Sequence, residues 1–177
     1  MTTPLVLTFV GHDRPGLVNA ISERVASAGG TWLESRLARL AGEFAGIVLV
    51  AAPEDKLAAL ASALGGLESA GLRVTISPSV PAAAAPSERL IALSIVGRER
   101  PGIVRDVTQA LTHLGVNIEE FSSGVEGEPF TGAGMFRANL SIRLPDGLAV
   151  DELRKTLERL AAEIMVDLSV GEGEPVG

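Results

Sequence analysis

The feature that most constrains the fold of this chain is a ten-residue segment that occurs twice. Residues 9–18 read FVGHDRPGLV and residues 95–104 read IVGRERPGIV, so that six of the ten positions are identical at an offset of 86 residues. The similarity continues on both sides of the segment without a gap. Self-similarity of this kind indicates two copies of one structural unit, and each half of the 177-residue chain must therefore be able to adopt the same fold.

The spacing of apolar residues predicts the same order of elements in both halves. Apolar residues alternate before the repeated segment, as in a strand, and recur at helical spacing after it. Two further strands, a second helix and a short last strand complete each half. The strands expected after the first helix cover 31–40, 44–52 and 72–77 in one half, and 116–123, 135–144 and 164–170 in the other. The order β-α-β-β-α-β predicts an α+β fold of two tandem ferredoxin-like domains, each an antiparallel four-stranded sheet with two helices on one face.

Proline and glycine mark the expected ends of the first helix in each half. Pro15 and Pro101 are predicted at the first helical position, where a fixed φ is helpful and a missing N–H costs nothing. Gly29 and Gly115 follow the last turn and are predicted to end the helices.

Composition along the chain predicts the domain boundaries. We expect a first domain over residues 1–78, a linker rich in proline and alanine over 79–87, a second domain over 88–173 and a flexible tail over 174–177. A loop hairpin over 124–134 has no counterpart in the first half.

Composition also excludes several classes of function. The chain has 22 acidic and 15 basic residues, and its net charge of −7 disfavours binding to nucleic acid or to an anionic membrane. It has no cysteine, which excludes thiol catalysis and disulfide scaffolds. Neither a signal peptide nor a membrane-spanning segment is evident, so a cytoplasmic location is expected. We predict no cofactor and no metal site, because His12 and His113 lie far apart in the sequence.

The repeated loop between strand and helix is the strongest candidate site. Unpaired N–H groups at a helix start attract an anion such as a carboxylate, and Gly16 and Gly102 leave room for it. Asp13 or Glu99 could meet an ammonium group, and together these features would suit an α-amino acid. A structural interpretation is equally open, in which the acids cap the helix and the neighbouring arginines are solvated.

The repeated motif resembles a known family. The pattern Gly-x-(Asp/Glu)-Arg-Pro-Gly-(Leu/Ile)-Val after a strand, within a β-α-β-β-α-β unit, is similar to the ACT domain, a regulatory amino-acid-binding module. Residues 115–118, GVNI, resemble the stretch that leads into the second strand of that family. Two such units without an attached enzyme, together with the hairpin that contains Pro129, Phe130 and 135–137, resemble the glycine cleavage system transcriptional repressor family.

The resemblance implies a ligand site at the first loop and the start of the first helix, where two ACT domains meet. The residues that it assigns are His12, Asp13, Pro15, Gly16, Leu17, Val18, Arg98, Glu99, Pro101, Gly102, Ile103, Val104 and Asn117. Thr31 stands at the position of Asn117, and Arg98 stands at that of His12. These differences argue against a symmetric pair of sites, so that one half could bind ligand while the other only packs.

The resemblance also implies a function. It predicts a non-enzymatic regulator that senses glycine or another small amino acid and controls a transcription factor or enzyme by protein–protein contact. In the resembled family the partner is a LysR-type transcriptional activator, and direct contact with DNA is not expected. The protein could also form a homodimer. Two alternatives remain open at this point: an interaction module whose ligand site has decayed, and a small enzyme on a ferredoxin-like scaffold.

Overall fold

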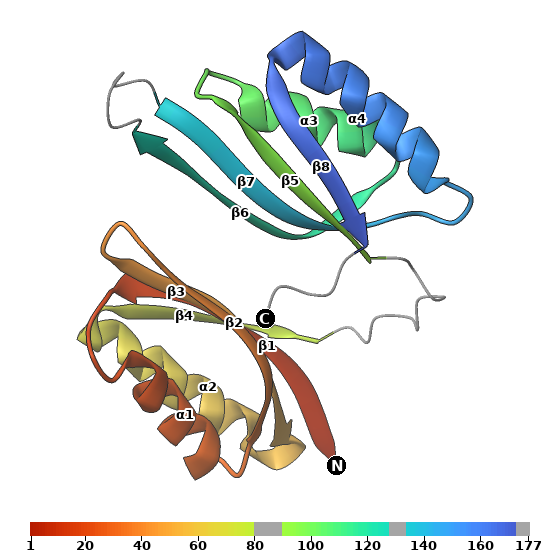
Figure 1. Ribbon diagram of the computed structural model, residues 1–177. Coiled ribbons are helices and arrows are strands. Elements are labelled where there is room, and N and C mark those ends of the chain that lie inside the picture. Colours follow the sequence, from red (N-terminus) through yellow and green to blue (C-terminus); the bar gives the residue numbers. More distant parts are fainter. Residues whose placement is uncertain (80–89, 128–133, 173–177) are drawn as a thin grey trace. The chain divides into compact units, whose positions relative to one another are not determined.

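The computed structural model describes residues 1–79, 90–127 and 134–172 (Figure 1). The chain divides into two compact units, Met1–Ala83 and Ala84–Gly177. The predicted linker over 79–87 and the tail over 174–177 lie almost entirely outside the described residues, so the domain boundaries stay a prediction.

Both units have the predicted element order. Unit 1 contains β1 (Thr2–His12), α1 (Leu17–Ser27), β2 (Thr31–Leu40), β3 (Glu43–Pro53), η1 (Glu54–Lys56), α2 (Leu57–Gly65), η2 (Gly66–Ala70) and β4 (Leu72–Pro78). Unit 2 contains β5 (Leu90–Arg98), α3 (Ile103–His113), β6 (Asn117–Gly127), β7 (Gly134–Arg143), α4 (Val150–Ile164) and β8 (Val166–Glu172). The antiparallel sheets have the orders β2-β3-β1-β4 and β6-β7-β5-β8, and in each unit both helices cover one sheet face (Figure 1). The predicted α+β, ferredoxin-like fold is confirmed.

Each core lies between the sheet and its two helices. Alternate residues of the central strands face the helices, and residues such as Leu7, Ile21 and Leu60 in unit 1 are fully buried. Burial of one large aliphatic side chain contributes roughly 1.5–3 kcal/mol, so these positions account for much of the stability. The apolar stripe of the first helix is narrower than its sequence suggests, because Val18 and Val104 remain exposed at the helix starts.

The first helix of each unit begins later than its proline. α1 starts at Leu17 and α3 at Ile103, two residues beyond the positions predicted from Pro15 and Pro101, and that prediction is wrong. The reason is that the glycine after each proline has a left-handed backbone conformation, which cannot be part of a right-handed helix, so the helix begins only at the following residue. The φ angle is 92° at Gly16 and 87° at Gly102.

The helix ends follow the prediction. Gly29 and Gly115 have φ angles of 71° and 68°, in the left-handed region. The N–H of Gly29 donates to the carbonyl of Ala26, and that of Gly30 donates to the carbonyl of Val25, which is a Schellman arrangement. The same pair of hydrogen bonds closes α3, so the two units end this helix in the same way.

The β2–β3 and β6–β7 hairpins differ in length. In unit 1 the last pair, Leu40 and Glu43, encloses Ala41 and Gly42, which both have positive φ as a type I′ turn requires. In unit 2 the strands run on to a pair between Gly127 and Gly134. The first part of the hairpin predicted over 124–134 is therefore strand, and residues 128–133 lie outside the described residues. Across the described ranges, no helix combines the length and the apolar character needed to cross a membrane.

Candidate functional site

The loop between β1 and α1 in unit 1 is held against the adjacent hairpin. The backbone N–H of Asp13 donates to the carbonyl of Gly42 at 2.9 Å, and the carbonyl of Gly16 accepts from Ala20 at 2.9 Å. A Cβ added to Gly16 would meet no heavy atom within 4 Å. Glycine is needed there for the left-handed backbone, and the side of the loop that it leaves bare is open.

A pocket of about 360 Å³ adjoins this loop and the start of α1. It is lined by Asp13, Arg14, Gly16, Leu17, Val18, Asn19 and Phe44. Four residues predicted to bind ligand thus line one pocket: Asp13, Gly16, Leu17 and Val18. Leu17 is 5% exposed and belongs chiefly to the core, whereas Val18 is exposed. Pro15 is exposed in the loop beside it.

Arg39 at the end of β2 is a charged residue near this pocket that the sequence analysis missed. Its Nε lies 2.5 Å from Oδ2 of Asp13. Arg39 is directly opposite Phe44 in the β2–β3 register, so both side chains project from the same side of the sheet. The strands expected over 31–40 and 44–52 leave a three-residue turn, which would set residue 39 opposite residue 45. The observed two-residue turn at Ala41 and Gly42 sets it opposite Phe44 instead.

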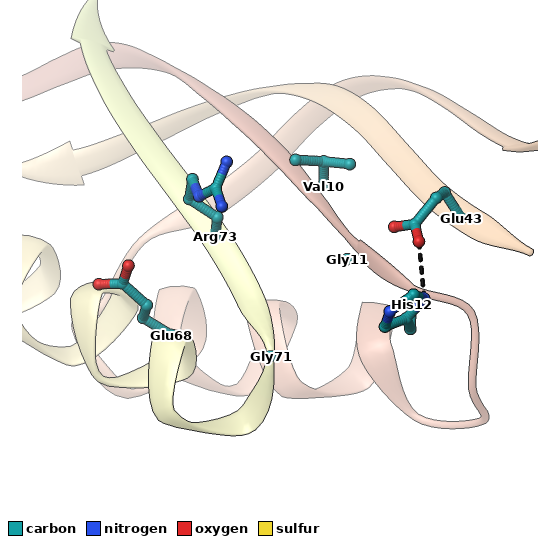
Figure 2. Close-up of a pocket in the computed structure, with 7 residues that line it drawn as sticks. All are labelled: Val10, Gly11, His12, Glu43, Glu68, Gly71 and Arg73. Atoms are coloured by element: carbon teal, nitrogen blue, oxygen red, sulfur yellow. Dashed lines mark ion pairs between the residues drawn. The ribbon is translucent and has the colours of Figure 1, made fainter.

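His12 belongs to a different hollow. Its Nδ1 lies 2.6 Å from Oε1 of Glu43, and its side chain is 92% exposed (Figure 2). The two residues line a second pocket of about 340 Å³, which shares no lining residue with the pocket beside Asp13. The residues predicted for one site in unit 1 are therefore divided between two.

The corresponding loop of unit 2 has the same backbone support but different charges. The N–H of Glu99 donates to the carbonyl of Gly134 at 2.8 Å, as Asp13 does to Gly42. Val125, opposite Phe136, occupies the register position of Arg39. Within the described part of unit 2, no arginine or lysine forms an ion pair with Glu99.

The arginine of the unit 2 loop is held by an acid of its own helix. Arg100 Nη2 lies 2.5 Å from Oδ2 of Asp106, and Arg105 Nη2 lies 2.8 Å from Oδ1. Hydrogen bonds from Arg105 and then Arg100 hold the pKa of Asp106 below its usual range. In unit 1 the matching arginine, Arg14, instead donates to the carbonyl of Ala70 at 2.5 Å. The two loops are therefore anchored differently.

The lowered pKa of Asp106 predicts how an Asp106→Asn variant responds to acid. Folding favours the charged carboxylate, so its stabilising effect is complete above the unfolded pKa and is lost as pH falls through the lower folded pKa. We expect Asp106→Asn to melt below wild type at neutral pH, with a difference that shrinks below about pH 4. Thermal melts followed by circular dichroism between pH 2 and 7 measure this, with Asp146→Asn as the matched surface control. A difference that does not change with pH would contradict the prediction.

The remaining predicted residues of unit 2 are not all in one place. Pro101, Gly102, Ile103 and Val104 follow Arg98 and Glu99 at the start of α3, and Ile103 is a core residue, 4% exposed. The guanidinium of Arg105 lies 3.1 Å from where a Cβ of Gly102 would be, so it covers the glycine.

Asn117 lies at the other end of the unit 2 sheet. It pairs with Arg143, which pairs with Leu90 at the start of β5, whereas the loop follows Arg98 at the end of that strand. At about 3.4 Å per residue, eight residues separate the two by roughly 27 Å. Asn117 Nδ2 donates to Glu119 at 2.6 Å. The structure therefore does not bring Asn117 to the loop of its own unit.

Comparison with known proteins relates the chain to regulatory and enzymatic sequences. It is 25% identical over 173 residues to the glycine cleavage system transcriptional repressor of Escherichia coli, covering 94% of this chain and 88% of that protein. It is 30% identical over 172 residues to phosphoserine phosphatase SerB2 of Mycobacterium tuberculosis, covering 94% of this chain. The chain spans only 40% of the length of that phosphatase.

Solved structures and family models agree on the fold. A protein of unknown function from Galdieria sulphuraria superimposes with a TM-score of 0.84 at 30% identity, covering 98% of this chain and 100% of that one. A putative glycine cleavage system transcriptional repressor has the same fold, with a TM-score of 0.72 at 21% identity and 97% coverage of both chains. Two family models, both described as ACT domain, match residues 3–77 and 91–158. The chain therefore belongs to the ACT-domain family and carries two ACT domains in tandem.

Proposed function

We propose that this protein is a non-enzymatic regulator that binds a small amino acid at the pocket beside Asp13 and acts on a partner protein by direct contact. Membership of the ACT family and the relationship to a repressor of the glycine cleavage system support a regulatory, amino-acid-sensing role. Glycine is the first candidate effector, and a transcription factor or an enzyme is the proposed partner. A LysR-type activator and a homodimer belong to the same proposal.

The observation that carries the proposal is the ion pair between Asp13 and Arg39 near the pocket. An α-amino acid has an ammonium group that suits the carboxylate of Asp13 and a carboxylate that suits the guanidinium of Arg39. The first N–H groups of α1 have no partner within the helix and would add donors for that carboxylate. Val18 and Phe44 provide apolar surface for a small side chain.

Binding in this way would exchange one ion pair for two. Asp13 and Arg39 are paired with each other in the structure, and the ligand would separate them and bind each. The exchange alters the loop before α1 and the end of β2 together. A partner that recognises one of the two arrangements more strongly would then respond to the amino acid, because only a difference in affinity can shift the population.

A thermal-shift screen against the common amino acids, followed by calorimetry, tests the proposal. A ligand at one hundred times its dissociation constant is expected to add about 2.7 kcal/mol to the free energy of unfolding. N-acetylglycine, which lacks the ammonium, and glycinamide, which lacks the carboxylate, serve as matched controls if glycine is the hit. Absence of any shift and of any heat of binding across the panel would contradict the proposal for free amino acids.

A further inference from the structure

The second pocket of unit 1 adjoins the last residues of β1 and shares no lining residue with the proposed amino-acid site. Residues of β1, β3, η2 and β4 line it, and it has a volume of about 340 Å³ (Figure 2). Its charged residues are His12, Glu43, Glu68 and Arg73.

Two glycines leave this hollow unfilled. A Cβ on Gly11 would lie 2.5 Å from the carbonyl oxygen of Gly71, so β1 and the turn before β4 approach each other backbone to backbone. Gly71 has a φ of 76° and would meet nothing within 4 Å on its side-chain face. Both glycines line the pocket, and neither contributes a side chain that would fill it.

The charges around the hollow are of both signs and are only partly paired. His12 and Glu43 form an ion pair on the β3 side. Glu68 of η2 and Arg73 of β4 line the opposite side (Figure 2), and neither side chain has an ion pair or hydrogen bond among the described residues. An anion and a cation that share one hollow without contacting each other are complementary to a small molecule that carries both charges.

The fold alone does not require this arrangement, because unit 2 lacks it. Val10 pairs with Arg73, and the matching Val96 pairs with Asp167, so the cation of β4 is replaced by an acid in β8. His12 pairs with Glu43, whereas Arg98 pairs with Met135. The difference between His12 and Arg98 is therefore one of several differences in charge between this hollow and its counterpart in unit 2.

We infer that the hollow is a second binding site of unit 1, specific for a small zwitterion such as an α-amino acid. The carboxylate of the ligand binds Arg73, its ammonium binds Glu68, and the His12–Glu43 pair closes the β3 side. A volume of about 340 Å³ is near the lower end for ligand pockets and is sufficient for a small amino acid. The site is separate from the pocket beside Asp13, since no residue lines both.

Nuclear magnetic resonance with the full ¹⁵N-labelled chain tests this inference site by site. Glycine, alanine and serine are titrated separately, and the amide signals of Gly11, His12, Gly71 and Arg73 are expected to shift and saturate with at least one of them. Arg73→Gln and Glu68→Gln should each weaken that response at least tenfold. Lys56→Gln, a cation of unit 1 that lines neither pocket, should leave it unchanged.

The same spectra separate this inference from the proposed function. Shifts confined to residues 16–19 would support the pocket beside Asp13 and overturn the second site. Shifts at Gly11 and Gly71 that persist unchanged in both Arg73→Gln and Glu68→Gln would overturn it too, as would the lack of a saturable shift there with all three amino acids. A response at Gly11 and Gly71 that both variants remove, without one at residues 16–19, would support the second site and contradict the proposed function.

Discussion

Asp13→Asn is expected to weaken binding of the amino-acid effector by about 10- to 100-fold, because it removes the negative charge that meets the ligand ammonium. Hydrogen bonds to charged groups are worth roughly 1.5–3 kcal/mol, which corresponds to a loss of that size. The substitution preserves the shape of the side chain and the backbone hydrogen bond from residue 13 to Gly42. Isothermal titration calorimetry with the amino acid that gives the largest thermal shift measures the change.

Variants at two other positions make this result specific. Arg39→Gln removes the other charge of the ion pair and should weaken binding by a similar factor. Glu99→Gln changes the acid of unit 2 that matches Asp13. Because unit 2 has Val125 instead of a cation at the register position of Arg39, this substitution should leave the affinity unchanged. The ion pair between Asp13 and Arg39 is largely exposed, so its loss should lower stability by no more than about 1 kcal/mol. Wild-type affinity in Asp13→Asn would contradict the pocket beside Asp13 as the binding site. Lost binding in Glu99→Gln would contradict its placement in unit 1.

The fold could be predicted from the sequence because the apolar pattern is short-range and is present twice. Leu5, Leu7 and Phe9 alternate in the first strand, and their repeats in β5 are buried in the same way. The first residues of the helices could not be located with the same accuracy as the strands. A proline followed by glycine is compatible both with a helix that begins at the proline and with a turn before it, and only the backbone conformation of Gly16 decides between them.

The part of the candidate site whose residues are neighbours in the chain could be predicted from the sequence. The contacts that residues from other strands make with it could not. Asp13, Gly16 and Val18 line one pocket because a single loop and helix turn carry them. His12 is adjacent to Asp13 in sequence but still belongs to the strand, so it lies opposite Glu43 and in another hollow. Arg39 reaches Asp13 from a different strand, a proximity that depends on the β2–β3 register.

The structure also explains part of the repeated motif without any ligand. Gly11 and Gly97 each precede the two loop residues that differ between the repeats, 12–13 and 98–99. Each of these glycines lies where the start of the last strand of its unit comes close to the first strand. A Cβ would lie 2.5 Å from the oxygen of Gly71 in unit 1 and 2.4 Å from a methyl carbon of Val166 in unit 2. These glycines are required by packing, so their repetition is not evidence for binding. The acid at Asp13, repeated as Glu99, does not have that explanation.

Gly11→Ala is therefore expected to destabilise unit 1 by about 1–3 kcal/mol, the usual range for an overpacked interior. The new Cβ would clash with a backbone oxygen, which cannot move aside as a flexible side chain could, and β1 and β4 would have to separate. Trp32 is the sole tryptophan of the chain and packs against the core of unit 1, so its fluorescence reports on this unit. Urea unfolding followed at Trp32 measures the change in midpoint.

Gly65→Ala is the matched control, because it adds the same methyl group to unit 1 with the opposite expected result. Gly65 is the last residue of α2, has a helical φ of −58°, and a Cβ there would meet no heavy atom within 4 Å. Alanine restricts the unfolded chain without straining the folded one, so stability should rise by about 0.4–1 kcal/mol. If Gly11→Ala unfolds at the same urea concentration as wild type, the close approach of β1 to Gly71 is not a constraint, and the glycine of the motif again calls for a functional explanation.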